Sequence, residues 1–496
     1  MAPPRGGRGC WTCKERKIAC DRQFPQCRIC LGSGRECKGY GMRLSWPRSN
    51  DSKRLQVVNA RKGSQKSASS SVPHWFINVY NSDIERLHDM LNPLTKRNVL
   101  PPLKRSPRWT PIDLAGAEVD LFSYYQNIVS PMLTSINNPA VQSLIFRMTL
   151  TDGALASVAI IFGIFALTCI HLNDPFRAQM YQTKARDAIK AAAIQQTGRG
   201  DKLRIIVAMN LLVMFEAIVS VDTRVNWAHN ICFIKHASIK AYDINQAHTG
   251  DSALVLYWAY YFDVISKFSI RHYERRWKAA IACAKMEQLT VVARNSPETT
   301  NIIPTLGCSL EVWGAIASSL NTVIHTMDGN DDQTEVLNKL ERRLKHAQQV
   351  IKVEELYEYD PGSMEKAQQT HSIAELYRLA GLIYLYRVGY SATATHSSLQ
   401  AAKTSAFVIL ERLYTCERTF PLFIVGCEAR TDNQRATILR LINNTRAQFT
   451  PTLITRIHNY LERFWAADEL DVAQHTGYDE KISAILSSGC ALPAFL

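Results

Sequence analysis

Apolar side chains recur every three or four residues along most of this chain, from about Leu114 to the last residues. The clearest example lies between Val336 and Ile351, where one side is apolar and the other carries lysine, arginine and glutamate. α-Helices produce this period, and no series of alternating strands with hairpin turns is present. The pattern predicts a mostly α protein, with one large all-α domain over residues 112–496.

Residues 153–173 form a separate apolar segment, with no Lys, Arg, Asp or Glu over 21 residues. An apolar stretch of roughly eighteen residues or more is typical of a membrane span. Polar side chains at Ser157 and Thr168 dilute this one, and no basic cluster flanks either end closely. A helix buried on all sides gives the same pattern. We therefore favour a buried core helix, with a membrane span as the alternative.

Residues 48–73 are polar and basic with too little apolar surface to form a core, and we interpret residues 48–111 as a flexible linker rich in basic residues, serine and proline. Within it, residues 74–92 predict a short amphipathic helix that Pro93 stops. The apolar residues of that helix have coiled-coil spacing: Ile77, Tyr80, Ile84, Leu87 and Leu91. They predict a stripe that docks on the helical domain, which we favour, or the seam of a homodimer, which is the alternative.

Charge is distributed unevenly along the 496 residues, whose net charge is +14. Residues 1–108 contain 22 Lys plus Arg and 7 Asp plus Glu, a balance of +15, so the remaining residues have a balance of −1. One basic arm is thus attached to an electrically neutral body. The asymmetry indicates a polyanionic partner for the N-terminal region, either nucleic acid or an anionic membrane surface.

Cysteines are clustered in the same basic region. Six of the thirteen lie within residues 10–37, and the N-terminal residues 1–8 lack the apolar core of a signal peptide. We therefore expect a reducing compartment, where clustered cysteines bind metal more often than they form disulfides. The other seven are scattered and are expected to be buried small apolar residues: Cys169, Cys232, Cys283, Cys308, Cys416, Cys427 and Cys490.

The six clustered cysteines form a doubled unit, a Cys-x-x-Cys followed six residues later by another cysteine: Cys10, Cys13, Cys20, Cys27, Cys30 and Cys37. Zinc prefers four ligands in a tetrahedron, and thiolates suit it well. One zinc ion would leave two cysteines unused, whereas two ions need eight ligand places from six sulfurs. Two sulfurs must then bridge both metals. The repeat makes the first cysteine of each half, Cys10 and Cys27, the natural bridge.

This cysteine segment closely resembles the fungal binuclear zinc cluster transcription factors. The resemblance rests on residues 9–21 (GCWTCKERKIACD) and on residues 25–30 (PQCRIC) through Cys37. It implies that residues 1–47 form a DNA-binding module in which two short helices wrap two zinc ions and Pro25 turns the chain between the halves. It also implies that Arg16 and Lys17 enter the major groove and read a CGG triplet. The chain departs from the family at Ala19, where a basic residue is usual.

Basic side chains around the predicted cluster have the chemistry that double-stranded DNA requires. Arg and Lys donate to guanine O6 and N7, the commonest specific base contact, while contacts to phosphates orient a module without reading sequence. Residues 39–47 look like the extension of the arginine-metabolism regulators, which implies that Arg43 reaches a phosphate while Trp46 packs on the module. Phosphate contacts are also predicted from the basic residues next to the cluster: Lys14, Arg22, Arg28, Arg35 and Lys38.

The helical body is similar to the fungal-specific transcription factor domain that accompanies such clusters. The matching stretches are residues 227–229 (WAH), 261–264 (YFDV) and above all 420–429 (FPLFIVGCEA). The resemblance implies an α-helical regulatory domain, a possible small-molecule effector and no catalytic residues. Catalytic motifs such as His-Glu-x-x-His or Gly-x-Ser-x-Gly are indeed missing from the sequence. His229 and His236 could share a helix face, but core or capping roles are favoured over metal ligation.

Together these features predict a nuclear, sequence-specific DNA-binding regulator of RNA polymerase II genes that contacts the transcription machinery. We favour an activator of a metabolic or biosynthetic gene set over a repressor. The acidic and aromatic residues 353–360 (VEELYEYD) fit an activation segment or a solvated helix end equally well. Weaker alternatives are an enzyme with a structural zinc cluster, an RNA-binding protein suggested by residues 5–9 (RGGRG), and a regulator tethered to a membrane by residues 153–173.

Overall fold

The computed structural model describes residues 9–23, 25–40, 114, 116–130, 139–195, 198–219, 227–241, 246–273, 289, 295–325, 333–351, 363–448, 451–470, 477–489 and 492–495. The chain divides into two compact units, residues 1–98 and 99–496, each of which is treated by itself. Several sequence predictions lie outside the described residues: the linker 48–111 with its helix at 74–92, Arg43, Trp46 and the acidic segment 353–360.

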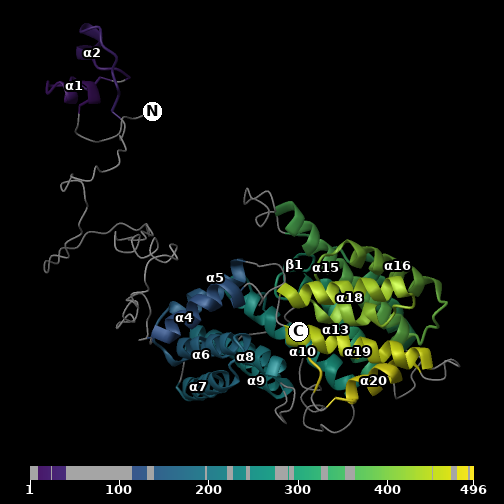
Figure 1. Cartoon of the computed structure of the whole chain (residues 1–496). Helices are drawn as coiled ribbons and strands as arrows, with labels where there is room; N and C mark the ends of the chain where they lie inside the picture. Colours follow the sequence, from purple (N-terminus) through teal and green to yellow (C-terminus); the bar gives the residue numbers. More distant parts are fainter. Residues whose placement is uncertain are drawn as a thin grey trace, which may run out of the picture. The chain divides into compact units, whose positions relative to one another are not determined.

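The described part of the first unit contains two short helices, α1 (Trp11–Glu15) and α2 (Arg28–Gly32) (Figure 1). Both are only 5 residues long, too short to be stable alone. The buried apolar side chains of this unit are the cysteines Cys10, Cys13, Cys27 and Cys30, with the partly buried Cys20, Cys37 and Tyr40 packed against them. A cluster of sulfur atoms therefore occupies the place of a hydrophobic core.

The described part of the second unit is almost entirely helical, which confirms the predicted fold class. Its helices are, in chain order, α4 (Gly116–Tyr124), the π-helix η1 (Tyr125–Val129), α5 (Pro139–Leu150), α6 (Leu155–His171), α7 (Pro175–Ile194), α8 (Arg199–Val219), α9 (Trp227–Ala241), α10 (Gly250–His272), α13 (Leu310–His325), α14 (Gln333–His346), α15 (Ser363–Tyr384), the π-helix η5 (Leu385–Gly389), α16 (Ser397–Arg412), α17 (Thr419–Gly426), α18 (Asp432–Gln448), α19 (Pro451–Leu470) and α20 (Tyr478–Ser487). Strands β1 (Ile302–Ile303) and β2 (Cys308–Ser309) pair antiparallel in a small hairpin.

Helix α6 is the apolar segment that the sequence left between a core helix and a membrane span. Twelve of its 17 residues are buried, and helices α7 and α8 pack against it. The hydroxyl of Ser157 donates to the Met148 carbonyl oxygen at 3.0 Å, and that of Thr168 to the Ile164 carbonyl at 2.9 Å. The preference for a buried core helix is confirmed. Over the described ranges, no helix has the length and apolarity that crossing a membrane requires.

Helix α10 is the central element of the second unit, because nearly all of its side chains from Ala253 to Ser269 are buried. It packs against α8 and α9 and also against α13 and α20, so it joins the helices grouped at the two ends of this unit in Figure 1. The Phe268 ring lies 5.1 Å from that of Phe420 and 5.0 Å from that of Phe495, both edge to face. One hydrophobic core therefore runs through the whole unit.

The scattered cysteines are mostly buried, as the sequence predicts. Cys169, Cys308, Cys416 and Cys427 are free thiols inside the core. Cys232 departs from the expectation, because it is only half-buried and is disulfide-bonded. Cys283 and Cys490 lie outside the described residues.

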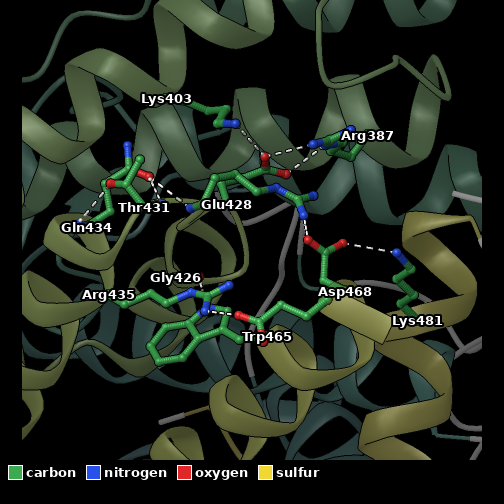
Figure 2. A network of polar contacts seen from close by, with 12 residues as sticks. Arg387, Lys403, Gly426, Glu428, Thr431, Gln434, Arg435, Trp465, Asp468 and Lys481 are labelled. Atoms are coloured by element: carbon green, nitrogen blue, oxygen red, sulfur yellow. Dashed lines mark hydrogen bonds and ion pairs between the residues drawn. The ribbon is translucent and has the colours of Figure 1, made fainter. Parts of the chain in front are cut away.

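A buried ionic network lies just after helix α17, within the family-like stretch 420–429 (Figure 2). Glu428 is fully buried and accepts two hydrogen bonds from Arg387, at 2.7 and 2.8 Å, while Lys403 Nζ lies 3.1 Å away. Burial opposes ionisation of Glu428, but the hydrogen bonds from Arg387 and the charge of Lys403 outweigh it, so the pKa of Glu428 is below its ordinary value. This carboxylate ties η5 and α16 to the end of α17.

A second part of the same network joins helices α19 and α20. Asp468 pairs with Arg430 and with Lys481, whose Nζ lies 3.0 Å from the carboxylate (Figure 2). Nearby, the Trp465 indole N–H donates to the Gly426 carbonyl at 2.9 Å. Breaking a buried pair by removing one partner is strongly destabilising, since the other charge is left without a counterion.

Glu428→Gln should therefore lower the free energy of unfolding of the full chain by about 3–5 kcal/mol at pH 7. Because the pKa of Glu428 is lowered in the native state, its ionisation stabilises the fold above the ordinary carboxyl pKa. That stabilisation is lost as the pH falls through the native pKa, so the difference between variant and wild type should shrink below about pH 4. Urea titrations at several pH values, followed by circular dichroism, measure both effects.

Glu411→Gln is the matched control, because Glu411 is exposed near the end of α16. Its effect on unfolding should stay within about 0.5 kcal/mol at every pH. Similar losses in the two variants would contradict a stabilising role for the buried carboxylate.

Candidate metal centre and DNA interface

The zinc module consists of two similar halves, 17 residues apart in the sequence. Each short helix begins directly after a cysteine whose sulfur accepts a backbone hydrogen bond: Cys10 from the Cys13 N–H at 3.4 Å, and Cys27 from the Cys30 N–H at 3.3 Å. Hydrogen bonds further along repeat with the same offset, since Ile18 N–H donates to the Cys13 carbonyl and Arg35 N–H to the Cys30 carbonyl. The doubled cysteine pattern is therefore also doubled in the backbone.

The six sulfurs converge between the two halves. Cys10 Sγ lies 3.6 Å from Cys27 Sγ and 3.7 Å from Cys30 Sγ, and Cys13 Sγ lies 3.7 Å from Cys27 Sγ. Two thiolates bound at about 2.3 Å to one tetrahedral zinc ion would be about 3.8 Å apart. The sulfurs are thus already spaced as zinc ligands.

Two groups of four sulfurs can each surround a metal ion: Cys10, Cys13, Cys20 and Cys27 form one, and Cys10, Cys27, Cys30 and Cys37 form the other. All sulfurs within a group lie within 4.8 Å of one another. The groups share Cys10 and Cys27, the same pair that the ligand arithmetic selects as bridges. The donor set fits two tetrahedral thiolate sites with two sulfurs in common.

Protonation of these thiols opposes metal binding by different amounts along the cluster. Burial raises the pKa of Cys10 to about 12 and raises that of Cys27 further. Burial also acts against the Cys20 thiolate, but the backbone N–H groups of Cys10 and Arg22 outweigh it and lower the pKa of Cys20 to about 7. Because thiolates are the ligands, metal binding at the two shared sulfurs must release protons, and affinity must rise with pH.

Hydrogen bonds outside the cluster hold the C-terminal end of the module to its first helix. The Thr12 hydroxyl donates to the Glu36 carbonyl and accepts from the Lys38 N–H, both at 3.0 Å. The Tyr40 hydroxyl donates to the Gln23 carbonyl at 2.7 Å, and its ring packs on the cysteine cluster. The sequence offered no signal for these contacts, which close the module around the sulfurs.

Two basic residues of the first half have a left-handed backbone that the second half gives to glycine. Lys17 has φ of 56° and Arg22 of 58°, and 17 residues later Gly34 has 60° and Gly39 has 68°. A residue other than glycine has a strained backbone in the left-handed region, usually by about 1–2 kcal/mol. The first half therefore keeps a strained backbone at two of the residues that the sequence predicts to contact DNA.

All described basic side chains of the module are exposed, and some have partners within it. Lys14 Nζ lies 4.5 Å from the centre of the Trp11 ring, and Lys38 Nζ lies 2.7 Å from the Glu15 carboxylate. One guanidinium N–H of Arg16, at the end of α1, donates to the Ser33 hydroxyl at 3.3 Å. These weak surface contacts orient the side chains and leave most of their donors available for an external anion.

Comparison with protein families identifies the family to which this chain belongs. A model of the fungal Zn(2)-Cys(6) binuclear cluster domain matches residues 8–47, and a model of the fungal specific transcription factor domain matches residues 120–480. The chain belongs to the fungal zinc cluster transcription factors. The cluster domain of these transcription factors binds zinc and DNA, and neither the family nor the similar proteins are enzymes.

Among characterised transcription factors of this kind, the chain is similar to "Transcription factor iacI" of Pestalotiopsis fici, with 24% identity over 399 residues, 78% of this chain and 98% of that protein. It is 47% identical over 38 residues to "Arginine metabolism regulation protein II" of Saccharomyces cerevisiae, which is 8% of this chain and 4% of the relative. It is also 37% identical over 60 residues to "Pestheic acid cluster transcriptional regulator 3" of Pestalotiopsis fici, 12% of this chain and 10% of that protein. No solved structure matches.

For the two histidines of helix α9, the sequence favoured core or capping roles over metal ligation. His236 is exposed, so it is not a core residue, and the side chain of His229 lies outside the described part of the chain. Among the described residues, the groups with metal-ligand geometry contain only the N-terminal cysteines.

The left-handed positions allow a direct test of backbone strain. Gly34→Ala should lower the stability of the metal-loaded module by about 1 kcal/mol, since the added Cβ meets nothing but the backbone becomes strained. Lys17→Gly removes strain and should not lower it. Release of zinc from the full chain to a competing chelator measures both changes.

Gly32→Ala is the control, because Gly32 also has open space around it but no positive φ. This variant should be neutral or slightly stabilising. Equal losses at Gly32 and Gly34 would show that side-chain bulk, rather than the left-handed backbone, causes the effect.

Proposed function

We propose that this protein is a nuclear transcription factor that binds CGG-containing DNA through residues 1–47 and regulates RNA polymerase II genes through residues 112–496. The observation that carries the proposal is the placement of Arg16 and Lys17, exposed at the end of helix α1 on a module held together by six sulfurs. Both side chains donate hydrogen bonds, and a helix end is narrow enough to enter the major groove. Residues 48–111 act as the linker between the two domains.

The proposed metal centre contains two zinc ions, with Cys10 and Cys27 bridging them. The two sulfur quartets that share these residues support this arrangement. The metal supplies the free energy that folds so small a module and holds helix α1 in place. The chain itself supplies six thiolates, two of them buried between the halves, and the basic surface that meets DNA.

The remaining basic residues are proposed to bind phosphates rather than bases. Lys14, Arg22 and Lys38 are exposed around the cluster, and Arg43 follows it in the sequence. Such contacts set the register and strength of binding without reading sequence. Gly34 and Gly39, the equivalents of Lys17 and Arg22 in the second half, have no side chain that could contact a phosphate. This difference supports a DNA-binding surface formed mainly by the first half.

An activating role in a metabolic or biosynthetic gene set is our preferred reading over repression. Two of the similar proteins are named as regulators of arginine metabolism and of a pestheic acid cluster. Docking of residues 74–92 on the helical domain or, as the alternative, homodimerisation through them remains a prediction of the sequence, as do contact with the transcription machinery and control by a small effector.

The full chain should contain two zinc ions, and a chain that begins at residue 51 should contain none. Cys10→Ser should remove more zinc than Cys13→Ser, because the first change takes a ligand from both metals and the second from one. Elemental analysis of the purified variants measures the content. One zinc ion per wild-type chain, or equal losses in the two serine variants, would contradict the bridged centre.

Arg16→Ala and Lys17→Gly should each weaken binding to a CGG duplex by about 1–3 kcal/mol and have a much smaller effect on random DNA. Glycine is chosen at position 17 because it keeps the left-handed backbone. Lys38→Ala serves as the comparison and should weaken both duplexes alike, reducing the salt dependence by about one unit. The reading role is wrong if Arg16→Ala lowers specific and random binding equally in titrations at matched salt.

A further inference from the structure

Three buried ionisable side chains meet where helix α9 packs against helix α10, far along the chain from the zinc module. Lys235 Nζ lies 3.1 Å from Asp263 Oδ1, and Lys267 Nζ lies 3.3 Å from Asp263 Oδ2. Their side chains are 1%, 1% and 0% exposed in the order Lys235, Asp263 and Lys267. Two ammonium groups therefore lie against one carboxylate inside the hydrophobic core, where a charge is costly unless it is paired and hydrogen-bonded.

The pair formed by Lys267 and Asp263 is incomplete. Neither Lys267 Nζ nor Asp263 Oδ2 makes a hydrogen bond of acceptable geometry within the described part of the chain. An ammonium group has three donors, and leaving them unused in the interior costs free energy. Burial lowers the pKa of Lys267, and Asp263 offsets this only in part because Lys235 acts in the same direction as burial. The surroundings of Lys267 therefore do not stabilise its charge.

Further polar atoms without a hydrogen-bond partner lie on the helices that pack together here. Both amide atoms of Asn210 on α8 and the hydroxyl of Ser238 on α9 are buried without a hydrogen-bond partner. The hydrogen bond from Asn230 to Glu216 fixes the register between the consecutive helices α8 and α9. Asn210 lies six residues before Glu216 on α8, and residue 236 lies six residues after Asn230 on α9. This register therefore places Asn210 level with residue 236, within one turn of both Lys235 and Ser238.

The other buried carboxylates of this domain differ in this respect. Both oxygens of Glu428 accept hydrogen bonds from Arg387, and Glu216 accepts from Arg186, Gln182 and Asn230. The carboxylate oxygens of Glu428 and Glu216 thus accept hydrogen bonds, whereas Asp263 Oδ2 accepts none within the described residues. The packed helices α8, α9 and α10 therefore each contain a buried side chain with unused hydrogen-bonding capacity: the Asn210 amide, the Ser238 hydroxyl and the Lys267 ammonium.

We propose that helices α8, α9 and α10 bind a small anion at Lys267, in the form of a carboxylate or phosphate group of a metabolite. The anion accepts from the Lys267 ammonium, the Asn210 amide and the Ser238 hydroxyl. Lysine is a compact point charge, so it does not demand the flat, two-pronged geometry that an arginine site selects. The description of this anion as an effector of transcription rests on the proposed function, whereas its binding does not.

Thermal unfolding of the full chain tests the site, with inorganic phosphate and succinate as probes at an ionic strength held constant with sodium chloride. An anion that binds only the folded state raises Tm in a saturable way. Wild type should show such a rise with at least one probe, and Lys267→Met should show none. Lys267→Met should also have a higher Tm than wild type without probe, because a poorly stabilised charge is gone while Lys235 and Asp263 still pair.

Lys190→Met is the matched control, because Lys190 is an exposed lysine of α7 and its loss should leave the rise intact. Asn210→Leu removes the unused amide without removing charge, and should weaken the apparent affinity by about fivefold or more. This second variant keeps the proposal testable if Lys267→Met does not fold.

A rise with phosphate alone, or with succinate alone, identifies which anion the site accepts. Equal rises in wild type and Lys267→Met, no rise with either probe, or a lower Tm for Lys267→Met without probe would overturn the proposal. Because none of these measurements involves DNA, failure here leaves the DNA-binding proposal untouched.

Discussion

The convergence of six thiols is the constraint on which the N-terminal module depends. The two helices of that module have 5 residues each, and its buried apolar side chains are the cysteines themselves. A unit of this size cannot bury enough apolar surface to offset the entropy of ordering its chain. Sulfur–metal bonds are the interaction that can replace a core, and the spacing of the sulfurs suits them. The described basic side chains proposed to meet DNA lie on the segments that this centre holds together.

The repeat of 17 residues explains why one half of the module is specialised. Both halves have the same capping sulfur and the same left-handed positions, so the metal centre needs them equally. Outside these shared features they differ, because the first half has Lys17 and Arg22 where the second has Gly34 and Gly39. Glycine meets the backbone requirement without strain, so the basic residues are not there for stability. The backbone strain at Lys17 and Arg22 is therefore explained by a surface that binds DNA.

The sequence could predict a zinc-binding segment because its cysteines are close together and their spacing repeats. The same holds for the class of the large domain and for helix α6, whose lack of charges over 21 residues fits its buried position. Lys17 and Arg22 could have been recognised as left-handed from the glycines 17 residues later, a signal the cysteine pattern already contained. The buried pairs could not be predicted in this way. Glu428 and Arg387 are 41 residues apart, and a lone carboxylate in a sequence is indistinguishable from a solvated one.

The total charge of the helical domain is close to zero, but its buried charged groups differ in how well they are hydrogen-bonded. Glu428 is surrounded by donors that satisfy it, and it links the segments that surround helix α17. Asp263 lies on the central helix α10 between two lysines, and its second oxygen completes no hydrogen bond. Helix α10 contacts helices at both ends of the domain, so a change in the charge balance around Asp263 acts on the element that joins them. A ligand that completes this cluster would thus be bound where the fold is best placed to transmit its effect.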